Sequence, residues 1–251
     1  MDTITIIATL IIILASGGLL FWFVRQLGDP EEVNLRPLAG IQSLKKQTGL
    51  AVETGRHFHI SPGRASLAGQ GNPSSLAGLS IMEYLANKAV ESDIPPVITT
   101  GDGSLTIGAQ DALRSAYQEA DRIEEYDPNL VRFQAAESEP MTFAAGVTQE
   151  IQDQEISTNI MVGRFGSEAV LVTEAADRMS FEQILGSDDP LALGVMAPVT
   201  DDLLIGEELF AATAYLHRQP VYLASIQLQD TLRILVCAGI FLAAIYYLVV
   251  G

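Results

Sequence analysis

The side chains best suited to chemistry stand in short glycine-containing segments that follow apolar runs. They are Gly63, Arg64, Gly101, Asp102, Gly103, Ser104, Arg164 and Asp188. Glycines let a backbone approach a ligand closely, and backbone amides at a helix N-terminus favour an anion. The two arginines can add charge-assisted hydrogen bonds to a phosphate or a carboxylate. These residues predict a binding site for a nucleotide or another small anion. The alternative is that such turns only connect strands to helices.

The sequence identifies no cofactor for such a site, so the cofactor is unknown. Gly69-Gln70-Gly71 lies in the first of these segments, but neither a complete Walker motif nor a complete dinucleotide fingerprint is present. His57 and His59 alternate and would face the same side of a strand. A catalytic zinc site normally has three protein ligands, and the third histidine, His217, stands far along the chain. We therefore predict no metal site and a structural role for the two histidines.

Catalysis lacks a complete set of residues. Gly101-Asp102-Gly103 resembles the GDG of thiamine-diphosphate enzymes, in which a downstream asparagine helps to bind Mg²⁺. Asn129 stands at a compatible distance, but Leu130 follows it where those enzymes have a second asparagine. No serine nucleophile elbow occurs, and the single cysteine, Cys237, lies within an apolar run and excludes an intrachain disulfide. We predict no catalytic residues and favour a protein that is not an enzyme.

Apolar segments at both ends predict membrane-spanning helices over residues 3–24 and 232–250. The first has 22 residues without a charge, which as a helix measure about 33 Å and cross a hydrocarbon core of about 30 Å. A cleaved signal peptide is the alternative for this segment. However, no basic residue precedes it, and the apolar run continues beyond its small residues at 15–18.

Basic residues next to the spans predict the orientation. Arg25 follows the first span, and Arg218 and Arg233 lie before or at the start of the second. The outer flanks contain no lysine or arginine, so the rule that positive residues stay inside places the intervening domain in the cytoplasm. Both termini are then extracytoplasmic, and the protein is a two-span protein of the cell membrane.

The charge of the chain limits its partners. The formal net charge is −17, from 14 basic and 31 acidic residues. Such a surface repels nucleic acid and anionic lipid headgroups, because both require clustered lysine and arginine. We predict no nucleic-acid partner. The predicted partners are the lipid bilayer and either further copies of the chain or other membrane proteins.

The middle of the chain alternates between short extended segments and helical ones. Extended segments are predicted at 57–60, 95–100, 131–135, 156–162 and 181–185, and helices at about 74–90, 104–122, 143–149 and 167–179. This alternation predicts an α/β fold, a mostly parallel sheet flanked by helices, tethered by one N-terminal and one C-terminal transmembrane helix. The predicted division is a linker and membrane-proximal segment at 25–50, an acidic α/β domain at 51–202, and an apolar helix with a stalk at 203–231. Within the last, residues 203–217 are expected to form one helix that ends before Pro220.

Several longer sequence segments resemble those of a known protein family. They are Ser61-Pro62-Gly63, Ile98–Gly103, Gly163–Gly166, Gly186–Pro190 and Ile205–Ala212. Together they resemble an uncharacterised prokaryotic membrane-protein family that is catalogued only as a domain of unknown function. The resemblance covers about residues 50–235 and implies a membrane α/β architecture without supplying an activity.

These observations support three hypotheses of different classes. The first is a membrane-anchored assembly or scaffold subunit that is homo-oligomeric and has a cytoplasmic α/β domain. The second is a membrane-tethered sensor that binds a small ligand, a nucleotide or an anion, at the glycine-rich segments. The third is a membrane-bound enzyme.

Overall fold

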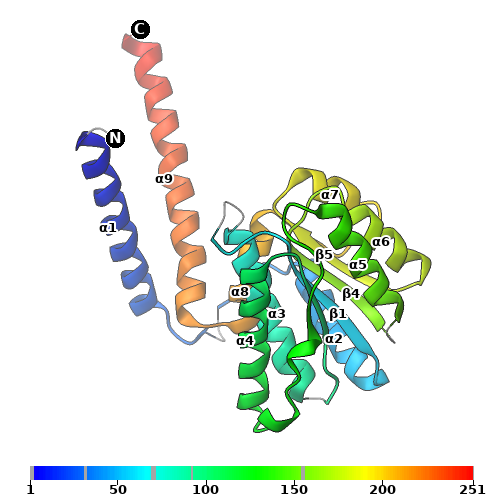
Figure 1. Ribbon diagram of the computed structural model, residues 1–251. Coiled ribbons are helices and arrows are strands. Elements are labelled where there is room, and N and C mark those ends of the chain that lie inside the picture. Colours follow the sequence, from blue (N-terminus) through cyan, green and yellow to red (C-terminus); the bar gives the residue numbers. More distant parts are fainter. Residues whose placement is uncertain (1–2, 31–32, 69–71, 92, 154–155, 251) are drawn as a thin grey trace. The chain divides into compact units, whose positions relative to one another are not determined.

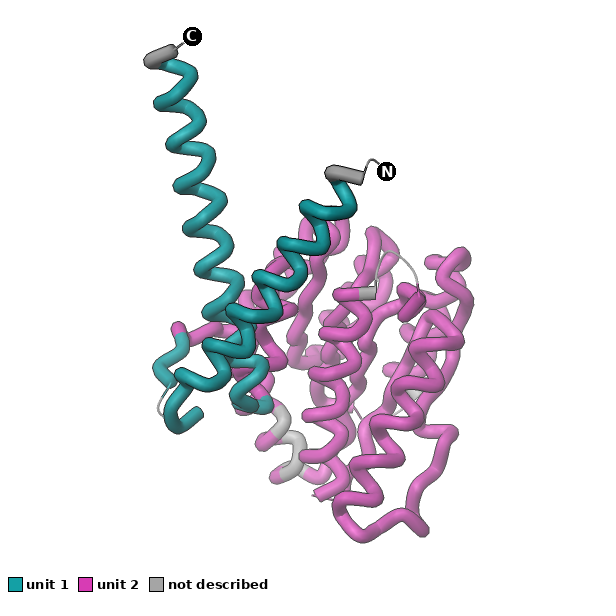
Figure 2. The backbone as a smooth tube through the Cα atoms, turned by 90° about the vertical axis from the view of Figure 1, so that its left-hand side faces the viewer, with its two compact units in different colours: residues 1–35, 217–251 teal, residues 36–216 magenta. Residues whose placement is uncertain are grey.

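The computed structural model describes residues 3–30, 33–68, 72–91, 93–153 and 156–250. The chain separates into two compact units, shown in different colours in Figure 2. Unit 1 consists of Met1–Leu35 and His217–Gly251, and unit 2 consists of Arg36–Leu216. Unit 2 therefore extends beyond the predicted domain of residues 51–202 at both ends.

Unit 1 contains the two terminal helices, α1 (Thr3–Gln26) and α9 (Pro220–Val250). Among the described residues, two helical segments are long and apolar enough to cross a membrane, Thr5–Gln26 with 22 residues and Pro220–Leu248 with 29. None of the residues in their most apolar windows is buried by the rest of the protein. The large side chains of these helices, such as Ile12 and Phe241, are mostly exposed, as expected for helices that are not part of a soluble core.

Unit 2 is built around a six-stranded sheet (Figure 1). Its strands are β1 (His57–Gly63), β2 (Val97–Thr100), β3 (Val131–Phe133), β4 (Ile156–Arg164), β5 (Glu182–Ser187) and β6 (Leu203–Ile205). They lie in the order β3-β2-β1-β4-β5-β6, and every neighbouring pair is parallel. The predicted α/β class is confirmed, and the sheet is entirely parallel. This order is that of doubly wound dinucleotide-binding folds, in which the chain reverses direction between β1 and β4.

Helices cover both faces of the sheet. They are α2 (Ala39–Thr54), α3 (Asn72–Glu91), α4 (Gly103–Glu119), α5 (Pro140–Asp153), α6 (Ala169–Arg178), α7 (Pro190–Met196) and α8 (Glu207–His217). Two short 3₁₀ turns, Ile123–Glu125 and Pro128–Leu130, precede β3. One core cluster joins the sheet to α2, α3, α4 and α8, and a second joins it to α5, α6 and α7. Adjacent residues of one strand, Ile160 and Met161, belong to different clusters because successive side chains point to opposite faces.

Two segments differ from the prediction. Part of the segment predicted as a linker is helix α2, and Leu38, Ile41 and Leu44 beside or within it are buried in the first core cluster. Their spacing of three residues places them on one face of the helix. Residues 203–217 do not form one helix, because the first three are strand β6 and Gly206, with φ of +54°, turns the chain into α8. The expected break before Pro220 is present, since α8 ends at His217.

Candidate functional site

The eight predicted site residues all lie at one edge of the sheet in unit 2. In a parallel sheet the carboxyl ends of all strands meet at the same edge, and ligands of open α/β sheets bind there, where the strand order reverses. Gly63 and Arg164 end the neighbouring strands β1 and β4, and Arg64 follows β1. Gly101 to Ser104 connect β2 to α4, and Asp188 follows β5. The neighbouring residues Gly69-Gln70-Gly71 lie outside the described part of the chain.

The backbones of β1 and β4 approach each other closely at this point. Gly63 and Gly163 have φ values of +113° and +145°, which side-chain-bearing residues rarely adopt. A Cβ atom on Gly163 would lie 2.1 Å from the carbonyl oxygen of Pro62. Helix α3 packs equally closely, because a Cβ on Gly78 would lie 2.3 Å from the carbonyl oxygen of Val162. Little space therefore remains between helix α3 and the carboxyl ends of β1 and β4.

Arg64 is bound within this narrow space by the chain itself. Its Nε donates to Oε1 of Glu168 at 2.5 Å, and its Nη1 donates to the carbonyl oxygen of Glu137 at 2.6 Å. The two paired side chains are only 20% and 3% exposed. Glu168 also accepts a hydrogen bond from the backbone N–H of Gly166 at 2.8 Å. A buried charge needs a partner of opposite sign, and Glu168 supplies it to Arg64 in place of an external anion.

Asp102 and Ser104 form the start of α4. Asp102 is the N-cap residue, and its carboxylate accepts hydrogen bonds from the backbone N–H groups of Ser104 and Leu105. The helix therefore begins at Gly103, one residue before the predicted start at about 104. The Ser104 hydroxyl donates to Asp102 and accepts from the N–H of Leu67 at 3.0 Å. An aspartate carboxylate already stands where an anion would bind at this helix N-terminus.

Arg164 is paired as well. Its Nη1 lies 3.2 Å from Oδ2 of Asp188, and its backbone carbonyl accepts the N–H of Arg64 at 3.2 Å. The second oxygen of Asp188, Oδ1, is buried and accepts no hydrogen bond within the described part of the chain. Buried carboxylate oxygens normally have a donor, and among the described predicted site residues Oδ1 of Asp188 is the one buried side-chain atom without a hydrogen-bond partner.

The two histidines belong to a buried polar row across the sheet. His59 is fully buried, its Nδ1 lies 2.7 Å from Oδ1 of Asn159, and its Nε2 lies 2.8 Å from Oγ1 of Thr99. Asn159 in turn donates to Gln183 at 3.3 Å. In the neutral ring, Nδ1 donates to the amide oxygen of Asn159 and Nε2 accepts from the hydroxyl of Thr99. Burial lowers the pKa of His59 from 6.5 to about 4.

The other predicted chemistry does not come together. His57 lies 2.8 Å from the carbonyl oxygen of Pro95 through its Nδ1. Asn129 precedes β3 at the amino edge of the sheet, whereas Asp102 lies at the carboxyl edge. The two cannot share a Mg²⁺ ion as in thiamine-diphosphate enzymes. Among the described residues, no group of three or more histidine, cysteine, aspartate or glutamate side chains is placed to bind a metal ion.

A family model described as a domain of unknown function, DUF6754, matches residues 2–251. The chain belongs to this family. The match extends over nearly the whole chain and confirms the resemblance to a family of unknown function. Neither the comparison with curated proteins nor that with solved structures found a match.

This DUF6754 chain has a further cavity that its sequence did not indicate. It lies at the amino edge of the sheet in unit 2 and has a volume of about 250 Å³. Its lining consists of Gln47, Leu50, Arg56, Ser157, Thr158, Ser180 and Glu182. Gln47 is the most buried of the described polar side chains of α2, with 8% exposed. The residues come from α2, the turn after it and the starts of β4 and β5, so no local sequence pattern could have grouped them.

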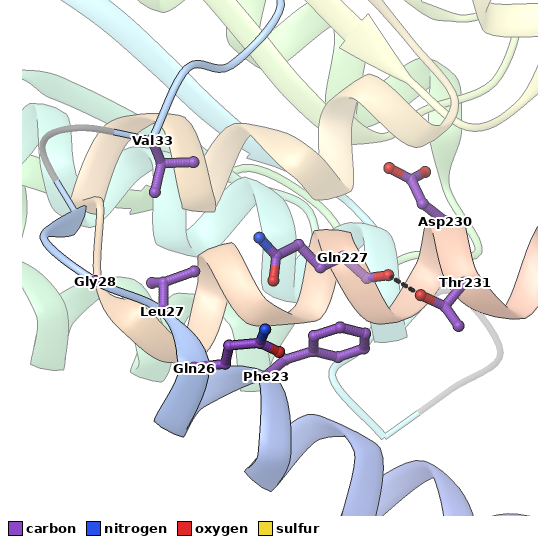
Figure 3. A pocket seen from close by; sticks show the side chains of 8 residues that line it. All are labelled: Phe23, Gln26, Leu27, Gly28, Val33, Gln227, Asp230 and Thr231. Carbon is purple, nitrogen blue, oxygen red and sulfur yellow. Dashed lines mark hydrogen bonds between the residues drawn. The ribbon is translucent and has the colours of Figure 1, made fainter.

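Unit 1 of the DUF6754 chain has a groove of about 540 Å³ where α1 ends beside α9 (Figure 3). It is lined by Phe23, Gln26, Leu27, Gly28, Val33, Gln227, Asp230 and Thr231. The Thr231 hydroxyl donates to the backbone carbonyl of Gln227 at 2.8 Å and is thereby satisfied within α9. The groove combines apolar side chains with two amides and a carboxylate.

The pKa of His59 predicts a pH-dependent loss of stability. The folded-state pKa lies below the unfolded value, so this contribution is fully present above pH 6.5 and is lost as the pH falls to about 4. The loss amounts to roughly 3 kcal/mol. We expect denaturant unfolding of the wild type to show this additional loss and His59→Gln to lack it.

His57→Gln serves as the matched control, because it removes the neighbouring ring and leaves the buried row intact. Its unfolding free energy should fall with pH as in the wild type. Parallel pH profiles for the wild type and His59→Gln would contradict the assignment of a neutral, buried His59.

Proposed function

We propose that the protein is a membrane-anchored assembly subunit of a prokaryotic cell membrane. In this proposal α1 and α9 both cross the bilayer, unit 2 is cytoplasmic, and both termini are extracytoplasmic. The chain self-associates through its membrane helices and presents unit 2 to other proteins. Its partners are the lipid bilayer, further copies of itself and other membrane proteins.

The lengths and charges of the terminal helices support the anchoring. The span of α1 has 22 residues, which at 1.5 Å per residue exceeds a hydrocarbon core of about 30 Å. In α9 the charged residues Asp230 and Arg233 lie in the first half, and residues 234–248 carry no charge. Arg25 ends the first span, so the flanking basic residues lie on the side of unit 2, which the positive-inside rule assigns to the cytoplasm.

The observation that carries the proposal is the occupied carboxyl edge of the sheet. At the point where a doubly wound fold binds its ligand, Arg64 is paired with Glu168, and Arg164 is paired with Asp188. Ligand anions would have to displace these carboxylates, at a cost of several kcal/mol for a buried pair. A domain whose ligand-binding edge is filled by its own ion pairs is better suited to contacts with proteins than to turnover of a substrate.

Self-association is tested by the particle size in mild detergent. Gly17 and Gly239 have open space around them, so a larger side chain fits the single chain but blocks close helix approach between copies. We expect the wild type to form a particle of more than one 27.0 kDa chain, and Gly17→Leu with Gly239→Leu to reduce its size.

Ile12→Leu is the matched control, because it changes an exposed apolar residue of the same helix without adding bulk. Its particle should keep the size of the wild type. A wild-type particle that contains one chain, measured by light scattering without co-purifying protein, would contradict the assembly proposal.

A ligand-binding sensor is the second candidate, and the amino-edge cavity favours it. Arg56 and Glu182 line the cavity, and neither is in an ion pair with a described residue. Its volume of about 250 Å³ is below the range of typical drug-sized pockets, which indicates a small anion rather than a nucleotide. The donors in it are the guanidinium of Arg56, the amide of Gln47 and the hydroxyls of Ser157, Thr158 and Ser180.

Thermal unfolding with inorganic phosphate, acetate and glutamate tests this candidate. If the cavity binds one of them, the melting temperature of the wild type should rise and that of Arg56→Met should not. Arg114→Met, which removes an exposed arginine of α4 outside the cavity, should respond as the wild type does. An absent shift with all three anions would remove the sensor hypothesis for this cavity.

A further inference from the structure

The most exposed apolar side chains of unit 2 gather at one edge of its sheet. Those that are at least half exposed among its described large apolar residues are Leu76 (50%), Ile107 (70%), Phe133 (51%), Met141 (56%), Leu191 (69%) and Ile205 (54%). We call these six residues the carboxyl rim. The exposed apolar residues at the amino edge, such as Leu50 and Ile123, are only 46% and 43% exposed.

The chain topology explains why the six residues share an edge. Leu76 and Ile107 lie in the second turns of α3 and α4, which begin at the carboxyl edge because they follow β1 and β2. Met141 and Leu191 are the second residues of α5 and α7, and Phe133 and Ile205 are the last residues of β3 and β6. The six strands span five spacings, about 24 Å. An α-helix of about 16 residues has this length.

The charge around the carboxyl rim is negative. Unit 2 contains 11 basic and 26 acidic side chains, a formal net charge of −15. The three arginines at this edge, Arg36, Arg64 and Arg164, are each in an ion pair with a carboxylate of unit 2. Their positive charge is therefore already neutralised within the unit.

Four further carboxylates stand between the rim residues. Asp102, Glu137, Glu139 and Asp189 form no ion pair with any residue that the structure describes. Glu139 and Asp189 are two positions from Met141 and Leu191, and Asp102 is five positions from Ile107. Exposed apolar groups are thus interspersed with carboxylates that are not paired with a described arginine or lysine, a pattern that complements lysine or arginine beside apolar residues.

We propose that the carboxyl rim binds a cationic amphipathic helix of a partner protein. This inference rests on the proposed function and names the chemistry of the partner that unit 2 recruits. Apolar side chains of the helix cover the rim, and its basic side chains lie near Glu137, Glu139 and Asp189. A second copy of unit 2 is a poorer occupant, since two such edges would bring like charges together. An anionic lipid surface is repelled for the same reason.

The test uses the full chain in nanodiscs of uncharged lipid. The probe is a fluorescein-labelled helical peptide of about 18 residues with leucine on one face and lysine on the other. Binding is measured by fluorescence anisotropy, with empty nanodiscs as the background. We expect binding that weakens as salt is raised and that is lost when glutamate replaces lysine in the peptide.

Variants at the two edges of the sheet locate the binding surface. Ile107→Ser with Leu191→Ser should weaken binding by about tenfold or more, because two apolar contacts are lost. Ile123→Ser with Met179→Ser makes the same kind of change at the amino edge and should leave the affinity unchanged. All four side chains are exposed to at least 38%, so we expect the fold to tolerate both changes, and circular dichroism of each variant checks this.

Three results would overturn the proposal. The first is equal binding by the rim variant and the wild type, and the second is an equal loss in both double variants. The third is rim-dependent binding to vesicles of anionic lipid, which would assign the carboxyl rim to a membrane. None of these depends on the particle size in detergent, so failure of self-association and failure of this inference are distinguishable.

Discussion

The close approach of β1 and β4 at their carboxyl ends is the constraint on which the site depends. Gly63 and Gly163 adopt backbone conformations that other residues rarely reach, and Gly78 lets α3 contact both strand ends. With so little space, the side chain that follows β1, Arg64, passes beside Gly101 and meets Glu168. Glu168 is 3% exposed and Arg64 is 20% exposed, so each charge depends largely on the other for compensation.

The ion pairs that fill the space beside β1 and β4 also affect the surface of the whole carboxyl edge of the sheet. Arg64 and Arg164, which the sequence suggests as anion-binding residues, are paired with carboxylates of the chain. The local charge is therefore determined by the remaining carboxylates, Asp102, Glu137, Glu139 and Asp189. Around them the first two turns of the helices expose apolar side chains such as Ile107 and Leu191. The carboxyl edge is therefore acidic and apolar at its surface, although its glycine-rich segments resemble those of an anion-binding edge.

Much of the fold was predictable because it depends on local patterns of apolar, charged and glycine residues in the sequence. Long uncharged segments predict the terminal helices, and alternating short apolar runs with glycine turns predict a parallel sheet. Helix α2 was missed because Pro37 before it and Gly40 at its start are typical of a linker, although Leu38, Ile41 and Leu44 have helical spacing. Strand β6 was missed because three apolar residues directly precede an apolar helix, and only the conformation of Gly206 separates them.

The position of the candidate site was predictable from the sequence, but the ion pairs within it were not. Glycine-containing turns after strands must meet at one edge of a parallel sheet, so the eight residues could be placed together. The partner of Arg64 stands 104 positions away, and nothing in the local sequence marks Glu168 as a buried carboxylate. The cavity between α2 and the starts of β4 and β5 was hidden for the same reason.

Measuring the interaction energy between Arg64 and Glu168 tests most directly whether this ion pair fills the carboxyl edge of the sheet. A double-mutant cycle with Arg64→Met and Glu168→Gln, followed by denaturant unfolding in mild detergent, isolates this energy from other effects of each change. We predict a coupling of about 2 kcal/mol or more, because removing one member leaves a buried charge uncompensated. The exposed pair Arg178–Glu174 should give at most about 0.5 kcal/mol in the same cycle. A coupling for Arg64–Glu168 no larger than that of the exposed pair would contradict the account.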